Sequence, residues 1–254
     1  MPLRLNKYLS EMGVCSRREA DRLIEEKKVL VDGRPAVMGM KIEEGQTVVC
    51  DGRPVGGFEG KKKDKPVLLA VNKPRGIVCT TSDKDRAVNI VDFLNYPVRI
   101  YPIGRLDKDS EGLLLMTNQG DLVNRIMRAG NEHEKEYLVK VNKPVTKDFI
   151  NAMSQGVPIL NTVTRPCFVE AVGKDRFRIV LTQGLNRQIR RMCEALGFRV
   201  LELKRVRIMN IHLGNLKTGD FRNVTPAESR ELMEILKDST NLPYKESQDG
   251  RKDS

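Results

Sequence analysis

The sequence has few of the residues that usually bind transition metals. It contains two histidines, His133 and His212, which stand far apart. Its five cysteines are odd in number and form no C-x-x-C pair, so we expect reduced core thiols with neither a disulfide framework nor a zinc site. Because a metal centre or a histidine relay has little material here, we expect any acid-base chemistry to use Asp, Glu, Tyr, Lys or Arg.

Long apolar runs are also missing. No stretch approaches the roughly 20 apolar residues that a membrane-spanning helix needs. The start of the chain, residues 1–4, lacks the apolar region of a signal peptide. We therefore expect a soluble, cytoplasmic protein with no membrane partner.

Acidic residues are outnumbered by basic ones. The 254 residues include 45 Lys and Arg against 34 Asp and Glu, which gives a formal net charge of +11. This excess favours a polyanionic partner. The length suits one large or two modest domains with enough chain for a core.

The first part of the chain predicts a small unit of two helices followed by short strands. Apolar residues between Leu5 and Met12 recur at helical spacing, and Ser16 stands three residues before Glu19 in a capping-box arrangement. Downstream, the dipeptide Asp32-Gly33 after an apolar run is a strong hairpin signal. Gly, Pro and Lys then dominate up to about residue 66, which is typical of a mobile basic linker.

Arg17, Arg18 and Arg22 form a basic face on the second of these helices. Taken alone, such a face is more simply interpreted as solvated surface than as an RNA contact. However, the segments 4–9, 16–21 and 31–33 resemble the S4 RNA-binding domain, which docks on structured RNA. The resemblance implies an S4 domain over residues 1–60 whose three arginines contact phosphates.

The remainder, residues 67–240, predicts a second domain of the α+β class. We expect a mainly antiparallel mixed sheet flanked by helices, because most strand candidates alternate with a period of two. The expected strands are 67–71, 77–81, 98–102, 113–116, 135–141, 176–181 and a pair within 198–213. The expected helices are 121–128, 186–196 and 226–237. The polar segment 241–254 is expected to be a disordered tail.

Asp107 lies in a charged loop, residues 104–112, directly before the apolar run Leu113-Leu114-Leu115-Met116. That run predicts a strand covered on both faces, which would hold Asp107 rigidly at the mouth of a core. An ordinary surface loop is an equally good interpretation of the pattern. A calcium loop is a poor one, because position twelve would be Asn118 and the flanking segments predict strands, where helices are needed.

Two other segments offer partners for this carboxylate. The predicted helix after Asn186 buries one apolar stripe and projects Arg187, Arg190 and Arg191, any of which can pair with a carboxylate and keep it ionised. Tyr137 offers a ring for stacking on a base and a hydroxyl for proton transfer. A solvated basic face and ordinary core packing remain the alternatives. From residue 186 to 222, nine Lys and Arg face three acidic residues, a net of +6.

These segments together resemble a known enzyme family, the pseudouridine synthases of the RsuA/RluB/RluE/RluF group. The similarity rests on Asn72-Lys73-Pro74, Gly104-Arg105-Leu106-Asp107, Lys135-Glu136-Tyr137 and Asn186-Arg187-Gln188-Ile189-Arg190-Arg191-Met192, in this order. The resemblance implies that Asp107 is the catalytic aspartate, Arg190 its ion-pair partner, and Tyr137 the ring that stacks on the target uracil. It further implies that Lys73, Arg105, Arg187 and Arg191 bind the substrate RNA.

The small-subunit branch of this family has a lysine in place of Arg190. The segments 121–124, 128–131 and 181–186 instead resemble the RluF branch, which modifies uridine in large-subunit ribosomal RNA. The implied function is isomerisation of uridine to pseudouridine, without cofactor or metal, by a monomer acting on free ribosomal RNA or an assembly intermediate.

Three mechanistic routes stay open: attack of Asp107 on C1′, attack on C6 of the base, or assisted loss of a sugar proton to give a glycal. Two other functions compete with this one. The first is a non-catalytic S4-type RNA-binding or ribosome-assembly factor, and the second is an RNA base hydrolase that uses the same carboxylate.

Overall fold

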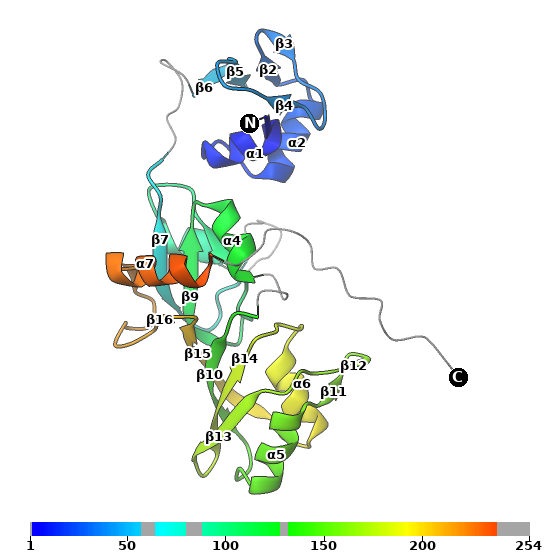
Figure 1. Cartoon of the computed structure of the whole chain (residues 1–254), viewed down its shortest axis with the longest axis vertical. Coiled ribbons are helices and arrows are strands. Elements are labelled where there is room, and N and C mark those ends of the chain that lie inside the picture. Colours follow the sequence, from blue (N-terminus) through cyan, green and yellow to red (C-terminus); the bar gives the residue numbers. More distant parts are fainter. Residues whose placement is uncertain (1, 57–63, 80–87, 128–131, 238–254) are drawn as a thin grey trace, which may run out of the picture. The chain divides into compact units, whose positions relative to one another are not determined.

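The computed structural model describes residues 2–56, 64–79, 88–127 and 132–237. The chain divides into two compact units (Figure 1). The first comprises 1–67 with the short segments 96–100 and 118–120, and the second comprises 68–95, 101–117 and 121–254. The proposed domains, 1–60 and 67–240, differ from these units mainly in the two short segments. The expected tail and residues 57–63 of the expected linker lie outside the described residues. None of the helices in the described part of the chain has both the length and the apolar composition that spanning a membrane requires.

The first unit contains the two expected helices and the expected hairpin. Its elements are β1 (Leu3–Arg4), α1 (Leu5–Glu11), α2 (Arg17–Glu25), β2 (Val29–Val31), β3 (Arg34–Pro35), β4 (Lys41–Ile42), β5 (Val48–Cys50) and β6 (Arg53–Val55). The Ser16 side chain caps α2 by accepting a hydrogen bond from the Glu19 amide at 3.1 Å. Asp32 and Gly33 both have positive φ, as the tight turn between β2 and β3 requires.

The second unit is built on one large sheet. The strands of this sheet are β7 (Leu68–Lys73), β8 (Tyr101–Ile103), β9 (Glu111–Thr117), β10 (Lys135–Val141), β13 (Phe168–Gly173), β14 (Arg176–Leu181), β15 (Val200–Ile208), β16 (Ile211–His212) and β17 (Phe221–Asn223). A separate two-stranded sheet pairs β11 (Pro158–Ile159) with β12 (Thr162–Val163). The helices of the second unit are α3 (Ile90–Leu94), α4 (Gly120–Met127), α5 (Lys147–Gln155), α6 (Gln188–Ala195) and α7 (Pro226–Ile235). The α+β prediction is confirmed.

The nine-stranded sheet has the order β13-β14-β10-β15-β9-β7-β17, with β16 added to β15 and β8 to β9. Within it, β9 and β15 pair in parallel, whereas the other pairings between its described strands are antiparallel. Strand β15 therefore lies between β9, which follows the Asp107 loop, and β10, which carries Tyr137. A late segment of the chain joins the two elements on which the candidate site depends.

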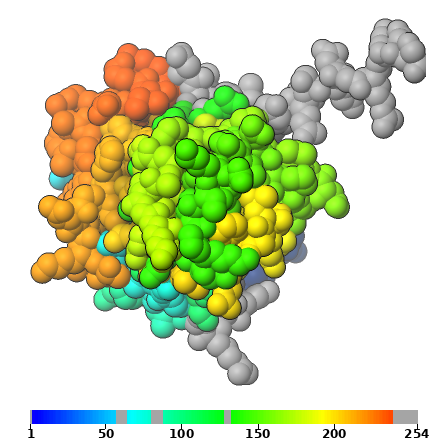
Figure 2. Space-filling view, turned by 90° about the horizontal axis from the view of Figure 1, so that it is seen from below, coloured from blue at the N-terminus to red at the C-terminus, as the bar shows by residue number. Residues whose placement is uncertain are grey.

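Two apolar cores stabilise this sheet. Helices α5 and α6 pack with β10, β13 and β14 at one end of the unit (Figure 1), where Phe149, Phe177 and Met192 are buried. The space-filling view shows this end from outside, with the segments coloured green, lime and yellow side by side (Figure 2). Helices α4 and α7 pack with β9 in the other core, through residues such as Leu115 and Leu232. Each of these side chains contributes about 1.5–3 kcal/mol by leaving water.

The structure corrects the expected strand over 77–81. Val78 forms an isolated bridge with Asn89, and residues 80–87 lie outside the described part of the chain. Helix α5 was not predicted, although its sequence carries clear signals: Thr146 caps the Phe149 amide at 3.1 Å, and Phe149 and Met153 repeat at helical spacing.

Candidate active site

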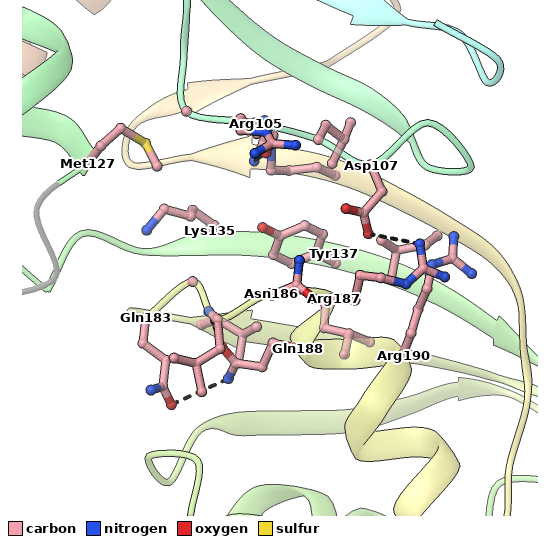
Figure 3. Close-up of a pocket in the computed structure, with 18 residues that line it drawn as sticks. Arg105, Asp107, Met127, Lys135, Tyr137, Gln183, Asn186, Arg187, Gln188 and Arg190 are labelled. Carbon is pink, nitrogen blue, oxygen red and sulfur yellow. Dashed lines mark hydrogen bonds and ion pairs between the residues drawn. The ribbon is translucent and has the colours of Figure 1, made fainter. Parts of the chain in front are cut away.

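A cavity of about 420 Å³ opens on the second unit (Figure 3). Its lining comes from the loop before β9, from β10 and β15, from the end of α4 and from the segment that leads into α6. The polar side chains among its lining residues are Arg105, Asp107, Lys135, Tyr137, Gln183, Asn186, Arg187, Gln188, Arg190 and Arg205. Such a cavity is large enough for a small organic group such as a nucleobase with part of its sugar.

A buried lysine, Lys73, holds the Asp107 loop in place. Lys73 is fully buried, and its Nζ donates to the carbonyl of Ser110 at 2.9 Å and to that of Pro74 at 2.7 Å. Desolvation lowers the pKa of this lysine. The expectation that Lys73 binds RNA is wrong, because its amine has no access to solvent and is occupied in holding the loop.

The carboxylate of Asp107 is about one third exposed and pairs with Arg187. Nη1 of Arg187 lies 3.8 Å from Oδ2 of Asp107 and equally far from Oδ2 of Asp109. Arg187 precedes α6 in a left-handed conformation, with φ 50° and ψ 35°. This conformation is unfavourable for a residue with a Cβ, so the position of the arginine carries backbone strain.

Arg190 contacts the loop rather than the Asp107 carboxylate. Its Nη2 donates to the carbonyl of Asp109 at 3.0 Å and to Oγ of Ser110 at 3.1 Å. Burial lowers the pKa of Arg190, and the neighbouring charges of Asp107 and Asp109 oppose that effect. The expected Asp107–Arg190 ion pair is therefore replaced in this structure by the Asp107–Arg187 pair, while Arg190 braces the loop from the helix side.

Tyr137 and Arg205 are direct cross-strand partners on β10 and β15. The Arg205 guanidinium carbon lies 6.0 Å from the centre of the Tyr137 ring. Arg205 is buried, and its Nε donates to the Leu113 carbonyl at 2.7 Å, which ties β15 to β9. A weaker contact of 3.4 Å joins its Nη1 to the Arg105 carbonyl, so one arginine links the Asp107 loop to the tyrosine.

Lys135 also lines the cavity, two residues before Tyr137 on the same face of β10. Its Nζ donates to the His133 carbonyl at 2.9 Å. Burial, reinforced by the charge of Arg205, lowers the pKa of Lys135 to about 8. From the sequence alone, no role is expected for Lys135 or Arg205. Lys135 stands two residues before Tyr137 in the same motif, so period-two spacing places it on the Tyr137 face, whereas the strand pairing that brings Arg205 there is not encoded locally.

Gln183 and Gln188 were also not foreseen. Oε1 of Gln188 accepts from the Leu185 amide at 3.0 Å, and its Nε2 donates to Oε1 of Gln183 at 3.3 Å. The buried Gln188 thus closes the loop before α6 and fixes the wall of the cavity opposite Asp107 (Figure 3).

The remaining expected RNA-binding arginines have different surroundings. Arg105 is exposed at the cavity, whereas Arg191 lies outside its lining and donates to the carbonyl and side-chain oxygens of Asn186. In the first unit, Arg17 and Arg18 are exposed and have no partner among the described contacts. Arg22 pairs with acidic side chains at both neighbouring helical turns.

Comparison with known proteins places the chain in context. Residues 67–195 match a family described as RNA pseudouridylate synthase, and residues 3–48 match the S4 domain. The chain is 52% identical to the dual-specificity RNA pseudouridine synthase RluF of Escherichia coli, over 94% of its own length and 81% of the relative's.

Two further similarities extend this comparison. The chain is 35% identical to the ribosomal large subunit pseudouridine synthase B of Bacillus subtilis, which covers 94% of this chain and 98% of that protein. A crystal structure described as a pseudouridylate synthase superposes with a TM-score of 0.66 at 27% identity, covering 91% of this chain and 99% of the other.

Proposed function

The chain belongs to the RNA pseudouridine synthases, and from this premise we propose that it converts uridine in large-subunit ribosomal RNA to pseudouridine in the Asp107 cavity. The relative from Bacillus subtilis is named for the large ribosomal subunit, which supports that substrate. RluF is named as dual-specificity, so more than one target uridine is part of the proposal. The proposal includes that the protein acts in the cytoplasm, as a monomer, on free RNA or an assembly intermediate.

The observation that carries the proposal is the meeting of Asp107 and Tyr137 in one cavity lined by cations (Figure 3). A nucleotide that is flipped out of its stack needs an aromatic side chain on which its base can stack. It also needs positive charge that holds the neighbouring RNA backbone. Tyr137 supplies the ring. Arg105 and Arg187 supply exposed charge at the cavity.

The reaction breaks the C1′–N1 bond, rotates the uracil and joins C5 to C1′. C5 loses a proton to water and N1 gains one, so the atoms balance without an imported group. Asp107 has a partly exposed carboxylate for attack on C1′ or C6, or for removal of a sugar proton on the glycal route. A negative charge close to an anomeric carbon with oxocarbenium character suits each route that involves the sugar.

The first unit supplies a second RNA contact in this proposal. Arg17 and Arg18 present exposed charge on α2, where phosphates of a structured RNA can reach them. Their charge is not offset by neighbouring acids, whereas that of Arg22 is. We assign capture of the large RNA to this surface and the chemical step to the second unit.

Release of tritium tests the proposal. Ribosomal RNA labelled at uracil C5 is expected to lose tritium to water with the wild-type protein, and carbodiimide mapping with and without the protein then identifies the uridine. Asp107→Asn is expected to abolish release while RNA binding persists. Asp109→Asn, which removes the neighbouring carboxylate that also faces Arg187, is the matched control and retains activity. Release by Asp107→Asn at the wild-type rate would exclude Asp107 from the mechanism.

A further inference from the structure

Two buried cations stand on the floor of the cavity without a carboxylate to balance them. Lys135 and Arg205 are 6% and 2% exposed, and neither has an acidic partner among the described ion pairs. Nη2 of Arg205 is buried with no hydrogen-bond partner. Since leaving a buried charged donor unsatisfied is unfavourable, such an arrangement indicates a ligand that supplies the missing acceptors.

Their position relative to the proposed reaction centre defines that ligand. Lys135 and Asp107 lie on opposite sides of the Tyr137 ring (Figure 3). If C1′ of the target nucleotide is at Asp107 and its base rests on Tyr137, the edge of the base opposite the glycosidic bond points to Lys135. In uridine this edge is the C4 carbonyl.

We propose that Lys135, backed by Arg205, forms the donor subsite for the carbonyl edge of the flipped uracil, an inference that rests on the proposed function. The ammonium of Lys135 uses one proton on the His133 carbonyl and has two left for an incoming oxygen. Arg205 keeps the local potential positive and fixes Tyr137 and the Asp107 loop around the base.

The symmetry of uracil makes one such subsite sufficient for the whole reaction. The ring position opposite N1 is C4, and the position opposite C5 is C2, and both carry a carbonyl oxygen. The rotation that exchanges N1 for C5 at C1′ also exchanges O4 for O2 at the far edge. Lys135 therefore meets an oxygen acceptor before and after rotation, and between them it faces the charge that the detached uracil anion spreads over both oxygens.

The same subsite selects against cytidine. Lysine and arginine offer donors and no acceptor. The C4 amino group of cytosine would place N–H donors against the Lys135 ammonium. The buried ammonium would then have no acceptor from the base, and the positive ends of the N–H dipoles would repel it. A site that requires a polar acceptor rejects a base lacking it more strongly than a purely apolar pocket does.

Protonation of Lys135 gives the proposal a pH signature. The charged and titratable groups around it are Arg205 from β15, His133 before β10, Tyr137 on the same strand, and Arg105 and Asp107 from the loop. Burial and Arg205 bring the pKa of Lys135 to about 8, so its charge is present below that pH and lost above it. We expect kcat to fall as the pH rises through about 8, and Lys135→Arg to keep its activity to higher pH because arginine stays charged.

Lys135→Met is expected to lower kcat on the order of 100-fold, the usual effect of removing one charged donor from a developing anion, and to raise KM by about 10-fold, because the bound uridine loses the same charged hydrogen bond. Lys140→Met is the matched control, because Lys140 lies on the opposite face of β10 and pairs with Asp175 and Glu202; it retains wild-type activity. An unchanged kcat in folded Lys135→Met, or a Lys135→Arg profile identical to that of the wild type, overturns the proposal.

A binding cycle separates recognition of the carbonyl from a merely structural role. The probe is the RNA segment identified by mapping, with either uridine or 2-pyrimidinone riboside, which lacks O4, at the target; both are bound to Asp107→Asn protein to prevent turnover. Uridine is expected to bind about 10-fold more tightly, in line with one charged hydrogen bond, and adding Lys135→Met should remove this difference. Equal weakening of both RNAs by Lys135→Met assigns the residue to structure and overturns the subsite. If the wild-type protein releases no tritium at all, the proposed function itself fails.

Discussion

The guanidinium of Arg187 lies 3.8 Å from the carboxylate of Asp107, and both side chains are more than one third exposed. An ion pair of this exposure contributes only about 0–1 kcal/mol, so an incoming phosphate can displace it at little cost. Arg190, by contrast, holds the loop through backbone and hydroxyl groups that RNA does not compete for. Of the two arginines near the start of α6, Arg187 is therefore available to the substrate, whereas Arg190 supports the loop.

Replacing Arg187 with asparagine separates these functions. Asparagine tolerates the left-handed backbone at this position, so the free energy of unfolding should stay equal or rise by up to about 1 kcal/mol. Without the exposed cation, KM for RNA is expected to rise about 5- to 10-fold, while kcat changes little. Arg190→Gln should show the reverse pattern, a large loss of kcat, and steady-state tritium release measures both. A fall in kcat alone for Arg187→Asn would contradict the division.

Gly112 is expected to tolerate no side chain. It has φ 106°, and an added Cβ would lie 2.3 Å from the carbonyl oxygen and 2.7 Å from the amide nitrogen of Arg205. Because backbone cannot move aside without breaking the β9–β15 pairing, Gly112→Ala should destabilise the protein by about 2–4 kcal/mol. Gly214→Ala has positive φ but open space around it, so it isolates the cost of backbone strain. Urea denaturation of both variants measures the difference, and equal losses would refute steric exclusion at Gly112.

The ring and the hydroxyl of Tyr137 can be tested separately. Tyr137→Phe keeps the stacking surface beside Arg205 and removes the proton-transfer group, so it should lower kcat with little effect on RNA affinity. Tyr137→Leu also removes the ring and should weaken binding of the flipped base by about 1–3 kcal/mol. Single-turnover rates and filter binding measure the two effects. Equal kcat for Tyr137→Phe and wild type would show that the hydroxyl takes no part in proton transfer.

The basic face of α2 is expected to act on capture rather than chemistry. The double change Arg17→Gln and Arg18→Gln should raise KM for large RNA and leave kcat unchanged. The slope of log K for RNA binding against log salt concentration, measured by a binding titration at several salt concentrations, should decrease in magnitude by about one per lost phosphate contact. Arg22→Gln is the matched control, since its charge is already paired with Glu19 and Glu26. A similar effect from Arg22→Gln would show that local pairing does not decide which arginine meets RNA.

Glu228 gives a stability prediction with a defined pH window. Its bidentate contact with Arg222, with both oxygen distances 2.8 Å, and its bonds within the α7 capping box lower its pKa to about 2. A carboxyl with a depressed folded-state pKa stabilises above its unfolded pKa and loses that contribution as the pH falls toward the folded value. Glu228→Gln should therefore lower the free energy of unfolding by about 1 kcal/mol at neutral pH. The difference in this free energy between the variant and the wild type should vanish as the pH falls from about 4.5 to 2. Denaturation at several pH values measures this, and a constant difference would contradict the linkage.

Much of the fold follows from local pattern, but the site depends on pairing that local pattern does not encode. Capping at Ser16 and Thr225, the Asp32-Gly33 turn and the buried run of β9 were all readable from the sequence. The insertion of β15 between β9 and β10 was not, because no short window records which strands become neighbours.

The same limit explains the errors at the site. Lys73 and Arg205 look like surface cations in the sequence, and their burial becomes evident only when the carbonyls of Ser110 and Leu113 are placed beside them. Asp107, Tyr137, Arg187 and Arg190 were foreseen as one constellation, but the sequence could not tell which arginine contacts the carboxylate. Side-chain pairing over a few ångströms depends on backbone conformation, here the left-handed residue at 187.

The central place of β15 also fixes when the site can exist during synthesis. The Asp107 loop and Tyr137 are made early, yet the strand that joins them ends at Ile208. Until that segment has left the ribosome, β9 and β10 have no common neighbour, and the cavity lacks Arg205 and its floor. The nascent chain therefore completes its first unit long before it can modify RNA, and activity arises only as the last third of the chain is folded.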